Sequence, residues 1–155
     1  MTKIIMNTPK LNKIDKEIKY LKKHGIKVGI FGTDAEKEQE GVKVKDYAIF
    51  LEYGTIYMPE RPFFRKATQL RKGKRLILEE EKEILKDVFL GNITGKQALS
   101  QLGIFIKQQI QEQITSNKFE PLKETTKKAK KRNVNNILRE NDFLLNSIFF
   151  EIIKL

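Results

Sequence analysis

Residues 95–116, GKQALSQLGIFIKQQIQEQITS, carry the clearest structural signal in this chain. Apolar residues recur along them at intervals of three and four: Leu99, Leu102, Ile106, Ile110 and Ile114. This spacing gathers them on one face of an α-helix. Thr94, followed three positions later by Gln97, has the form of a capping box, which marks the start of a helix. The stretch therefore predicts an amphipathic helix over 95–116.

The segments outside this helix predict a second long helix and a small sheet. Good helix formers run from 63 to 90, interrupted only by Gly73, and the turn-forming GNITG separates this run from the 95–116 helix. We expect the two helices to pair. Residues 26–31, IKVGIF, and 147–154, SIFFEIIK, are rich in β-branched and aromatic residues, which favours strands. The expected fold is α+β, with a small mixed or antiparallel sheet packed against long amphipathic helices.

Three further segments complete the expected single domain over residues 1–155. Residues 9–24 predict a helix with one apolar stripe and an opposite face that is almost all Lys. Residues 32–43, with two Gly and four acidic side chains, predict a mobile acidic loop. After a short helix over 44–53, the two prolines of TIYMPERP predict an extended arm over 55–62.

Composition narrows the classes of chemistry that the chain can perform. Its 155 residues include no Cys and a single His, so thiolate zinc sites, cysteine nucleophiles and clusters of histidine ligands are excluded within one chain. We interpret His24 as a cation near a helix end. No apolar run is long enough to span a bilayer, and MTKIIMNTPK lacks the apolar stretch of a secretory signal. We expect a cytoplasmic, non-enzymatic protein without a metal or cofactor.

The net charge of +11 is unevenly distributed. Residues 1–33 hold eight positive and two negative side chains, whereas residues 34–60 hold three positive and seven negative side chains. The densest basic run, at 123–132, offers candidate polyanion contacts: Lys127, Lys128, Lys130, Lys131 and Arg132. A solvated charge run is the plainer interpretation, because aromatic residues are not interleaved there. A basic nucleic-acid-binding module is therefore the alternative function, and an acidic protein surface is an equally suitable partner.

Five short segments, in order, resemble the head-to-tail joining and tail-completion proteins of tailed bacteriophages. They are VGIFG at 28–32, YAIFLEYGT at 47–55, MPERPFFRKA at 58–67, PLKETTKKAKK at 121–131 and NDFLLNSIFFEI at 141–152. The sequence departs from the family pattern at two places. Phe119 stands two residues before Pro121, and Asn141–Asp142 replaces the family's Thr-Gly pair.

The resemblance implies a non-enzymatic structural protein that acts in virion assembly at the head–tail neck, as a ring of copies. It implies self-association and contacts with neighbouring neck and tail proteins, with DNA nearby and no membrane. The expected location is the virion, after assembly in the host bacterial cytoplasm. The residues that it assigns to the assembly interface are Glu52, Gly54, Thr55, Pro59, Arg61, Pro62 and Phe63. Among them we expect Arg61 to be the charged anchor, because its planar guanidinium can bridge carboxylates on a neighbour.

Overall fold

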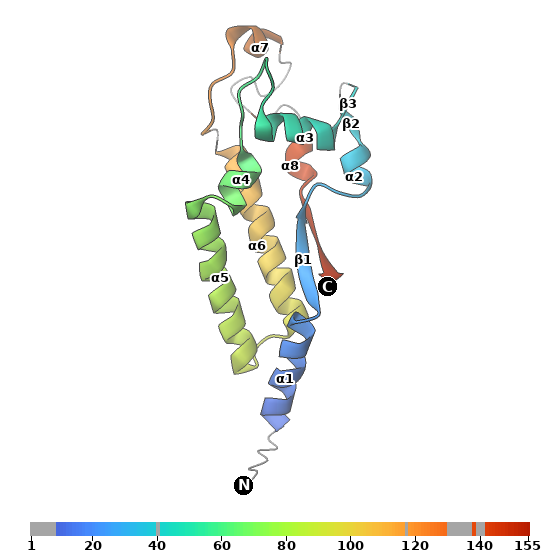
Figure 1. Cartoon of the computed structure of the whole chain (residues 1–155), viewed down its shortest axis with the longest axis vertical. Helices are drawn as coiled ribbons and strands as arrows, with labels where there is room; N and C mark the ends of the chain where they lie inside the picture. The colour runs from blue at the N-terminus through green and yellow to red at the C-terminus, as the bar shows by residue number, and fades with distance from the viewer. Residues whose placement is uncertain (1–8, 40, 117, 130–137, 139–141) are drawn as a thin grey trace.

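The computed structural model describes residues 9–39, 41–116, 118–129, 138 and 142–155, which form an elongated molecule (Figure 1). Its longer helices are α1 (Pro9–Leu21), α3 (Val44–Tyr53), α5 (Arg71–Leu90) and α6 (Gly95–Thr115). Its shorter helices are α2 (Thr33–Glu36), α4 (Phe63–Thr68), α7 (Glu124–Ala129) and α8 (Phe143–Asn146). The strands are β1 (His24–Gly29), β2 (Glu38–Gln39), β3 (Val42–Lys43) and β4 (Phe149–Lys154). The α+β fold class is confirmed.

Helix α6 is the central element. It packs against α5 and α4, and also against β1 and β4 (Figure 1). The predicted capping box is present, because the Gln97 N–H donates to Thr94 Oγ1 over 3.2 Å and the Thr94 N–H donates to Gln97 Oε1 over 2.8 Å. The predicted pairing of the two long helices is also confirmed.

Strands β1 and β4 pair antiparallel, although more than a hundred residues separate them in the chain. Ile26 lies opposite Ile152 and Val28 opposite Phe150, so these four side chains share one face of the sheet. At the contact with α6, a Cβ on Gly103 would lie 2.3 Å from Phe150 Cδ2. The sheet approaches α6 closely because this helix position has no side chain.

The expected continuous helix over 63–90 is wrong. Helix α4 ends at Thr68 and the backbone becomes extended at Leu70, so α4 and α5 are separate helices. At this corner Gly73 packs against the end of α4, and a Cβ there would lie 2.2 Å from the Ala67 carbonyl oxygen. The break thus lies three residues before Gly73, at Leu70, and this glycine permits the close corner rather than breaking the helix itself.

Two other sequence expectations need correction. Residues 32–43 contain α2 and the small β2–β3 hairpin, so they are not an irregular loop throughout. Helix α1 ends at Leu21, and His24 begins β1 instead of ending the helix. The His24 ring stacks on Tyr20 with 3.9 Å between centroids, and its Nδ1 lies 2.9 Å from the Tyr20 carbonyl oxygen.

The buried core is concentrated at one end of the molecule. There α3, α4, α6 and α8 meet around buried side chains that include Leu51, Phe63 and Ile110. A smaller cluster of Ile84, Val88 and Ala98 joins α5 to α6. Among the described residues, no helix is both long enough and apolar enough to cross a membrane.

Candidate assembly surface

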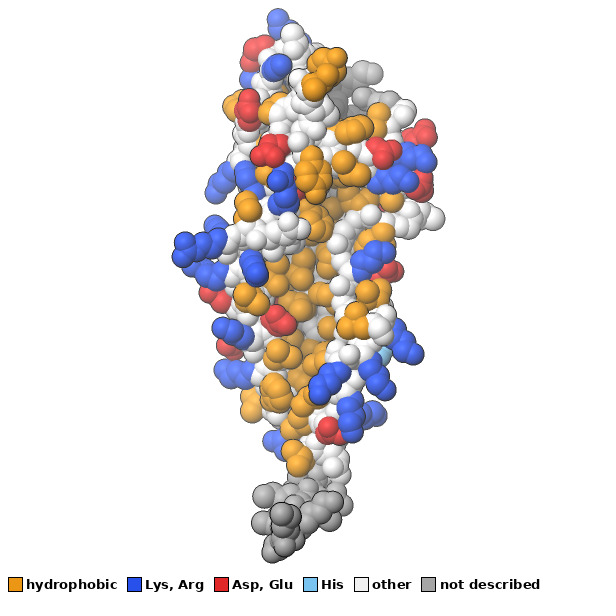
Figure 2. All heavy atoms as spheres, in the orientation of Figure 1, with side chains coloured by type: hydrophobic (Ala, Val, Ile, Leu, Met, Phe, Trp, Pro, Cys, Tyr) orange, Lys and Arg blue, Asp and Glu red, His pale blue; other side chains and the backbone are white. Residues whose placement is uncertain are grey.

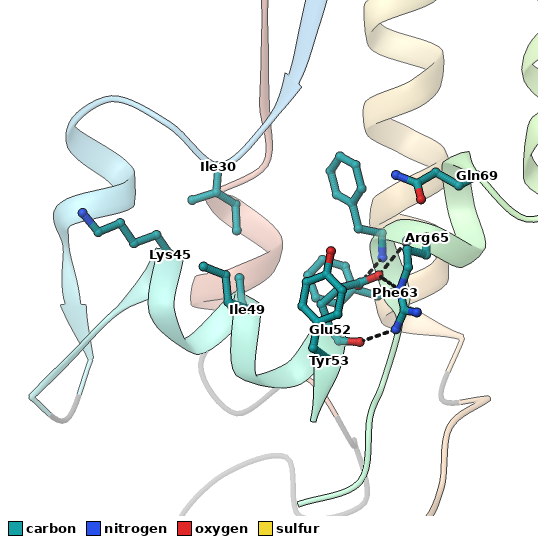
Figure 3. A pocket seen from close by; sticks show the side chains of 10 residues that line it. Ile30, Lys45, Ile49, Glu52, Tyr53, Phe63, Arg65 and Gln69 are labelled. Atoms are coloured by element: carbon teal, nitrogen blue, oxygen red, sulfur yellow. Dashed lines mark hydrogen bonds and ion pairs between the residues drawn. The ribbon is translucent and has the colours of Figure 1, made fainter. Parts of the chain in front are cut away.

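The arm after α3 is anchored by the buried carboxylate of Glu52. This side chain is 8% exposed and accepts hydrogen bonds from the backbone N–H groups of Phe64 and Arg65, each over 2.9 Å. These two groups belong to the first turn of α4, whose N–H groups have no partner within the helix. Arg65 Nε also donates to Glu52 Oε1 over 2.9 Å. Glu52 therefore fixes the start of α4 against the end of α3, across the arm (Figure 3).

Arg65 completes this network from the other side of the arm. Its Nη2 donates to the Glu52 carbonyl oxygen over 2.7 Å and to the Glu60 carboxylate over 2.9 Å. The hydrogen bond to Glu60, followed by that to Glu52, raises the pKa of Arg65 above its usual value. The guanidinium also lies over the Tyr53 ring, 4.9 Å from its centroid. One cation thus joins α3, the arm and α4.

The expected extended arm over 55–62 is wrong for its first half. Thr55 and Met58 form an isolated antiparallel bridge, with N–H to O distances of 2.8 and 3.2 Å, which closes a tight turn over Ile56 and Tyr57. Gly54, with φ 73°, begins this turn, and a Cβ there would lie 2.8 Å from the Glu60 backbone nitrogen. A side chain at this position would force the two legs of the arm apart.

Arg61 and Phe63 do not lie on the surface of the subunit. Arg61 is 3% exposed and Phe63 2%. The Arg61 N–H donates to the Leu51 carbonyl oxygen over 2.6 Å, and its side-chain Nε has no acceptor in the described structure. Burial lowers the pKa of the Arg61 guanidinium. The expectation that Arg61 anchors a neighbouring subunit is corrected, because its guanidinium is enclosed within its own chain.

The remaining residues assigned to the interface support the arm or lie along it. Glu52 is buried and Gly54 half-buried, so both act inside the subunit. Pro59 and Pro62 are half-buried, whereas Thr55 is exposed. The residues that the resemblance assigns to the interface therefore mainly hold the arm in place. The side chains that face outward belong to other residues of α3 and the arm.

The outward-facing side chains form a patch that sequence reasoning missed. Five large apolar residues of α3 and the turn are exposed by between 44% and 89%, and we call them the α3–arm patch: Ile49, Phe50, Tyr53, Ile56 and Tyr57. Ile56 and Tyr57, at the tip of the turn, are the most exposed, at 89% and 82%. The signal was present in the sequence, because Ile49, Phe50 and Tyr53 lie off the helical stripe formed by Val44, Ala48 and Leu51.

Beside the patch lies a shallow pocket of about 250 Å³, between α3 and α4 (Figure 3). Ile30, Ile49 and Phe63 give it a mainly apolar lining, and Lys45 and Arg65 add two cations. Its size and lining suit an apolar side chain of a protein partner. Among the described residues, no group of three or more His, Asp or Glu side chains could hold a metal ion.

The candidate polyanion contacts are only partly placed. Lys127 and Lys128 belong to α7, where Lys127 forms an ion pair of 2.7 Å with Glu124 and Lys128 is exposed. Lys130, Lys131 and Arg132 lie outside the described residues.

Comparison of the chain with models of known protein families, with curated proteins and with solved structures found no match.

Proposed function

We propose that this chain is a non-enzymatic structural protein of a tailed phage, which acts in virion assembly at the head–tail neck. In this proposal it serves in tail completion or head–tail joining, as a ring of copies. The order of the five short segments supports the viral context. The observation that carries the assembly role is the α3–arm patch, in which five large apolar side chains of α3 and the anchored arm are exposed.

The patch has the chemistry of a protein interface. Aromatic residues are enriched at interface centres, and Tyr is prominent among residues that contribute most of the binding energy. Five large apolar side chains exposed within nine residues of the chain favour an interaction site. Phe50, Tyr53 and Tyr57 supply three aromatic rings, each more than 40% exposed.

The anchoring of the arm also favours a docking role. Glu52 and Arg65 hold both ends of the arm, and the Thr55–Met58 bridge closes its tip. A segment that is already ordered loses little conformational entropy on binding. Ile56 and Tyr57 are therefore presented to a neighbouring protein in a fixed geometry.

The proposal is tested by electron microscopy of particles from a phage or prophage that carries an early stop codon in this gene. We expect separate DNA-filled heads and tails. Normal infectious virions would overturn the proposal and would favour the nucleic-acid module instead.

Complementation of the stop mutant then tests the patch. The double variant Ile56→Ser/Tyr57→Ser should fail to restore joining, whereas Ile104→Ser should restore it. Ile104 is a matched control, because it is an apolar residue of α6 that is 45% exposed and lies outside the patch. Circular dichroism of both purified proteins verifies that they fold. Full joining by the double variant would contradict the role of the patch.

A further inference from the structure

Helix α1 carries an apolar stripe that its own chain covers only in part, and least at its N-terminal end. Leu11, Ile14, Ile18 and Leu21 form the stripe, yet no residue of α1 is buried and Leu11 is 52% exposed. Only the C-terminal part of the helix is fixed: the Gly95 N–H donates to Glu17 Oε2 over 2.7 Å, and Leu21 packs on the Ile84 cluster. Most helical stability in proteins comes from packing of the apolar face. The first turn of α1, which includes Leu11, is exposed throughout and lacks such packing.

A groove continues from the end of this stripe. We call it the α5–α6 groove; it has a volume of about 220 Å³, and its lining includes Leu21, His24, Glu81, Leu85 and Leu102, with the buried side chains of Ile84 and Leu99. Figure 2 shows hydrophobic side chains running down the middle of this face, between margins that hold many Lys and Arg side chains. Since Leu21 belongs both to the stripe and to the groove, the two form one apolar surface along the molecule.

The groove and α1 differ in charge. Glu81 is the acidic residue that lines the groove, and it forms no ion pair with any residue that the structure describes. Lys10 and Lys13 lie beside the stripe of α1 and likewise have no ion pair within the described part of the chain. A carboxylate at an apolar contact favours a partner that carries a positive charge at the matching position.

We propose that the α5–α6 groove of one copy binds α1 of a second copy. The groove takes in residues 81–85 of α5 and 98–102 of α6, so at 1.5 Å per residue it accommodates about one turn of α1. Docking places Leu11 and Ile14 against the half-buried Leu85 and Leu102, and it brings Lys10 or Lys13 to Glu81. The contact can be made reciprocally by a pair or in sequence around a ring. It rests on the proposed function only in that copies of the chain associate.

Engineered cysteines test the contact directly, since the natural chain has none. An Ile14→Cys protein is mixed with a size-tagged Leu102→Cys protein and oxidised, so that any mixed disulfide must join two copies. We expect this mixed species to predominate over that from Ile14→Cys with Ile104→Cys. Ile104 is a demanding control because it lies on the same helix and is more exposed than Leu102. Absence of the mixed species, or equal yield from the control pair, overturns the proposal.

Charge reversal provides the second test, by sedimentation of the purified full chain. Glu81→Lys should weaken self-association about tenfold, as expected for loss of one close charge pair. Adding Lys10→Glu/Lys13→Glu to that variant should restore association. Glu83→Lys is the matched control, because Glu83 lies on the same helix, is highly exposed and does not line the groove. Equal effects of Glu81→Lys and Glu83→Lys would contradict the pairing.

The contact between copies and the role in virion assembly can each be refuted without refuting the other. The cross-link reports a contact between purified copies and needs no phage, whereas the stop mutant reports virion assembly. A specific cross-link together with infectious stop-mutant particles would retain the contact and remove the viral role. Defective particles without a cross-link would retain the viral role and remove the contact.

Discussion

Replacing Glu52 should destabilise the protein far more than replacing Glu60, the other residue whose carboxylate contacts Arg65. In Glu52→Ala, the Phe64 and Arg65 N–H groups at the start of α4 lose their acceptor, and Arg65 Nε loses its partner. Loss of a helix N-terminal acceptor costs about 1–2 kcal/mol, and a hydrogen bond to a charged group contributes about 1.5–3 kcal/mol. Because these three bonds share one carboxylate, we expect a combined loss of about 3 kcal/mol.

Glu60 is the matched control for this experiment. Its carboxylate also accepts from Arg65 over 2.9 Å, but its side chain is 60% exposed, compared with 8% for Glu52. Exposed ion pairs contribute at most about 1 kcal/mol, so Glu60→Ala should have a small effect. Glu52→Gln should fall between the two alanine variants, because the amide keeps one acceptor oxygen and loses the charge.

Urea unfolding followed by circular dichroism measures these free energies of unfolding. The midpoint should shift while the dependence on urea stays constant, since the same surface is exposed on unfolding. If Glu52→Ala and Glu60→Ala lowered the free energy of unfolding equally, the carboxylate of Glu52 would not be the anchor of the arm.

Three further outcomes are expected. Gly103→Ala should lower the free energy of unfolding by about 1–3 kcal/mol through overpacking, because its Cβ would lie 2.3 Å from Phe150 Cδ2. Adding Phe150→Leu to this variant should recover part of the loss. An unchanged urea midpoint for Gly103→Ala would contradict the close approach. Hydrogen bonds from Lys43 and Lys45 lower the pKa of Glu36 to about 2, so any stabilisation from this exposed carboxylate is present above pH 4.5 and is lost as the pH falls towards 2. An NMR titration should show the pKa of Glu36 returning towards 4.5 in Lys43→Ala, and no return would refute the pairing. Because the net charge is +11, duplex DNA binding measured by fluorescence anisotropy should be weak and non-specific and should fall with salt; tight, sequence-selective binding would favour the nucleic-acid module.

The sequence alone was sufficient for the elements whose signals are local. The 95–116 helix, its capping box and the 44–53 helix depend on apolar spacing and on groups within a few residues of each other. The β4 strand follows from a run of aromatic and β-branched residues. These features were predicted correctly because neighbouring residues supply the interactions that form them.

Contacts between distant residues decided what the local signals could not. The break at Gln69 and Leu70 lies in a run of good helix formers, and it follows from packing of Gly73 against Ala67. Likewise, arginine is usually a surface residue, but tertiary packing of the arm encloses Arg61.

The candidate assembly surface shows the same division between what local sequence signals predict and what tertiary contacts decide. The sequence identified the segment from Glu52 to Phe63, whereas the tertiary structure turned Glu52 and Phe63 inward and left Ile56 and Tyr57 exposed. The physical reason is that a sequence pattern reports which residues share one face of an element. Which of those faces is covered depends on segments that meet only in the folded chain.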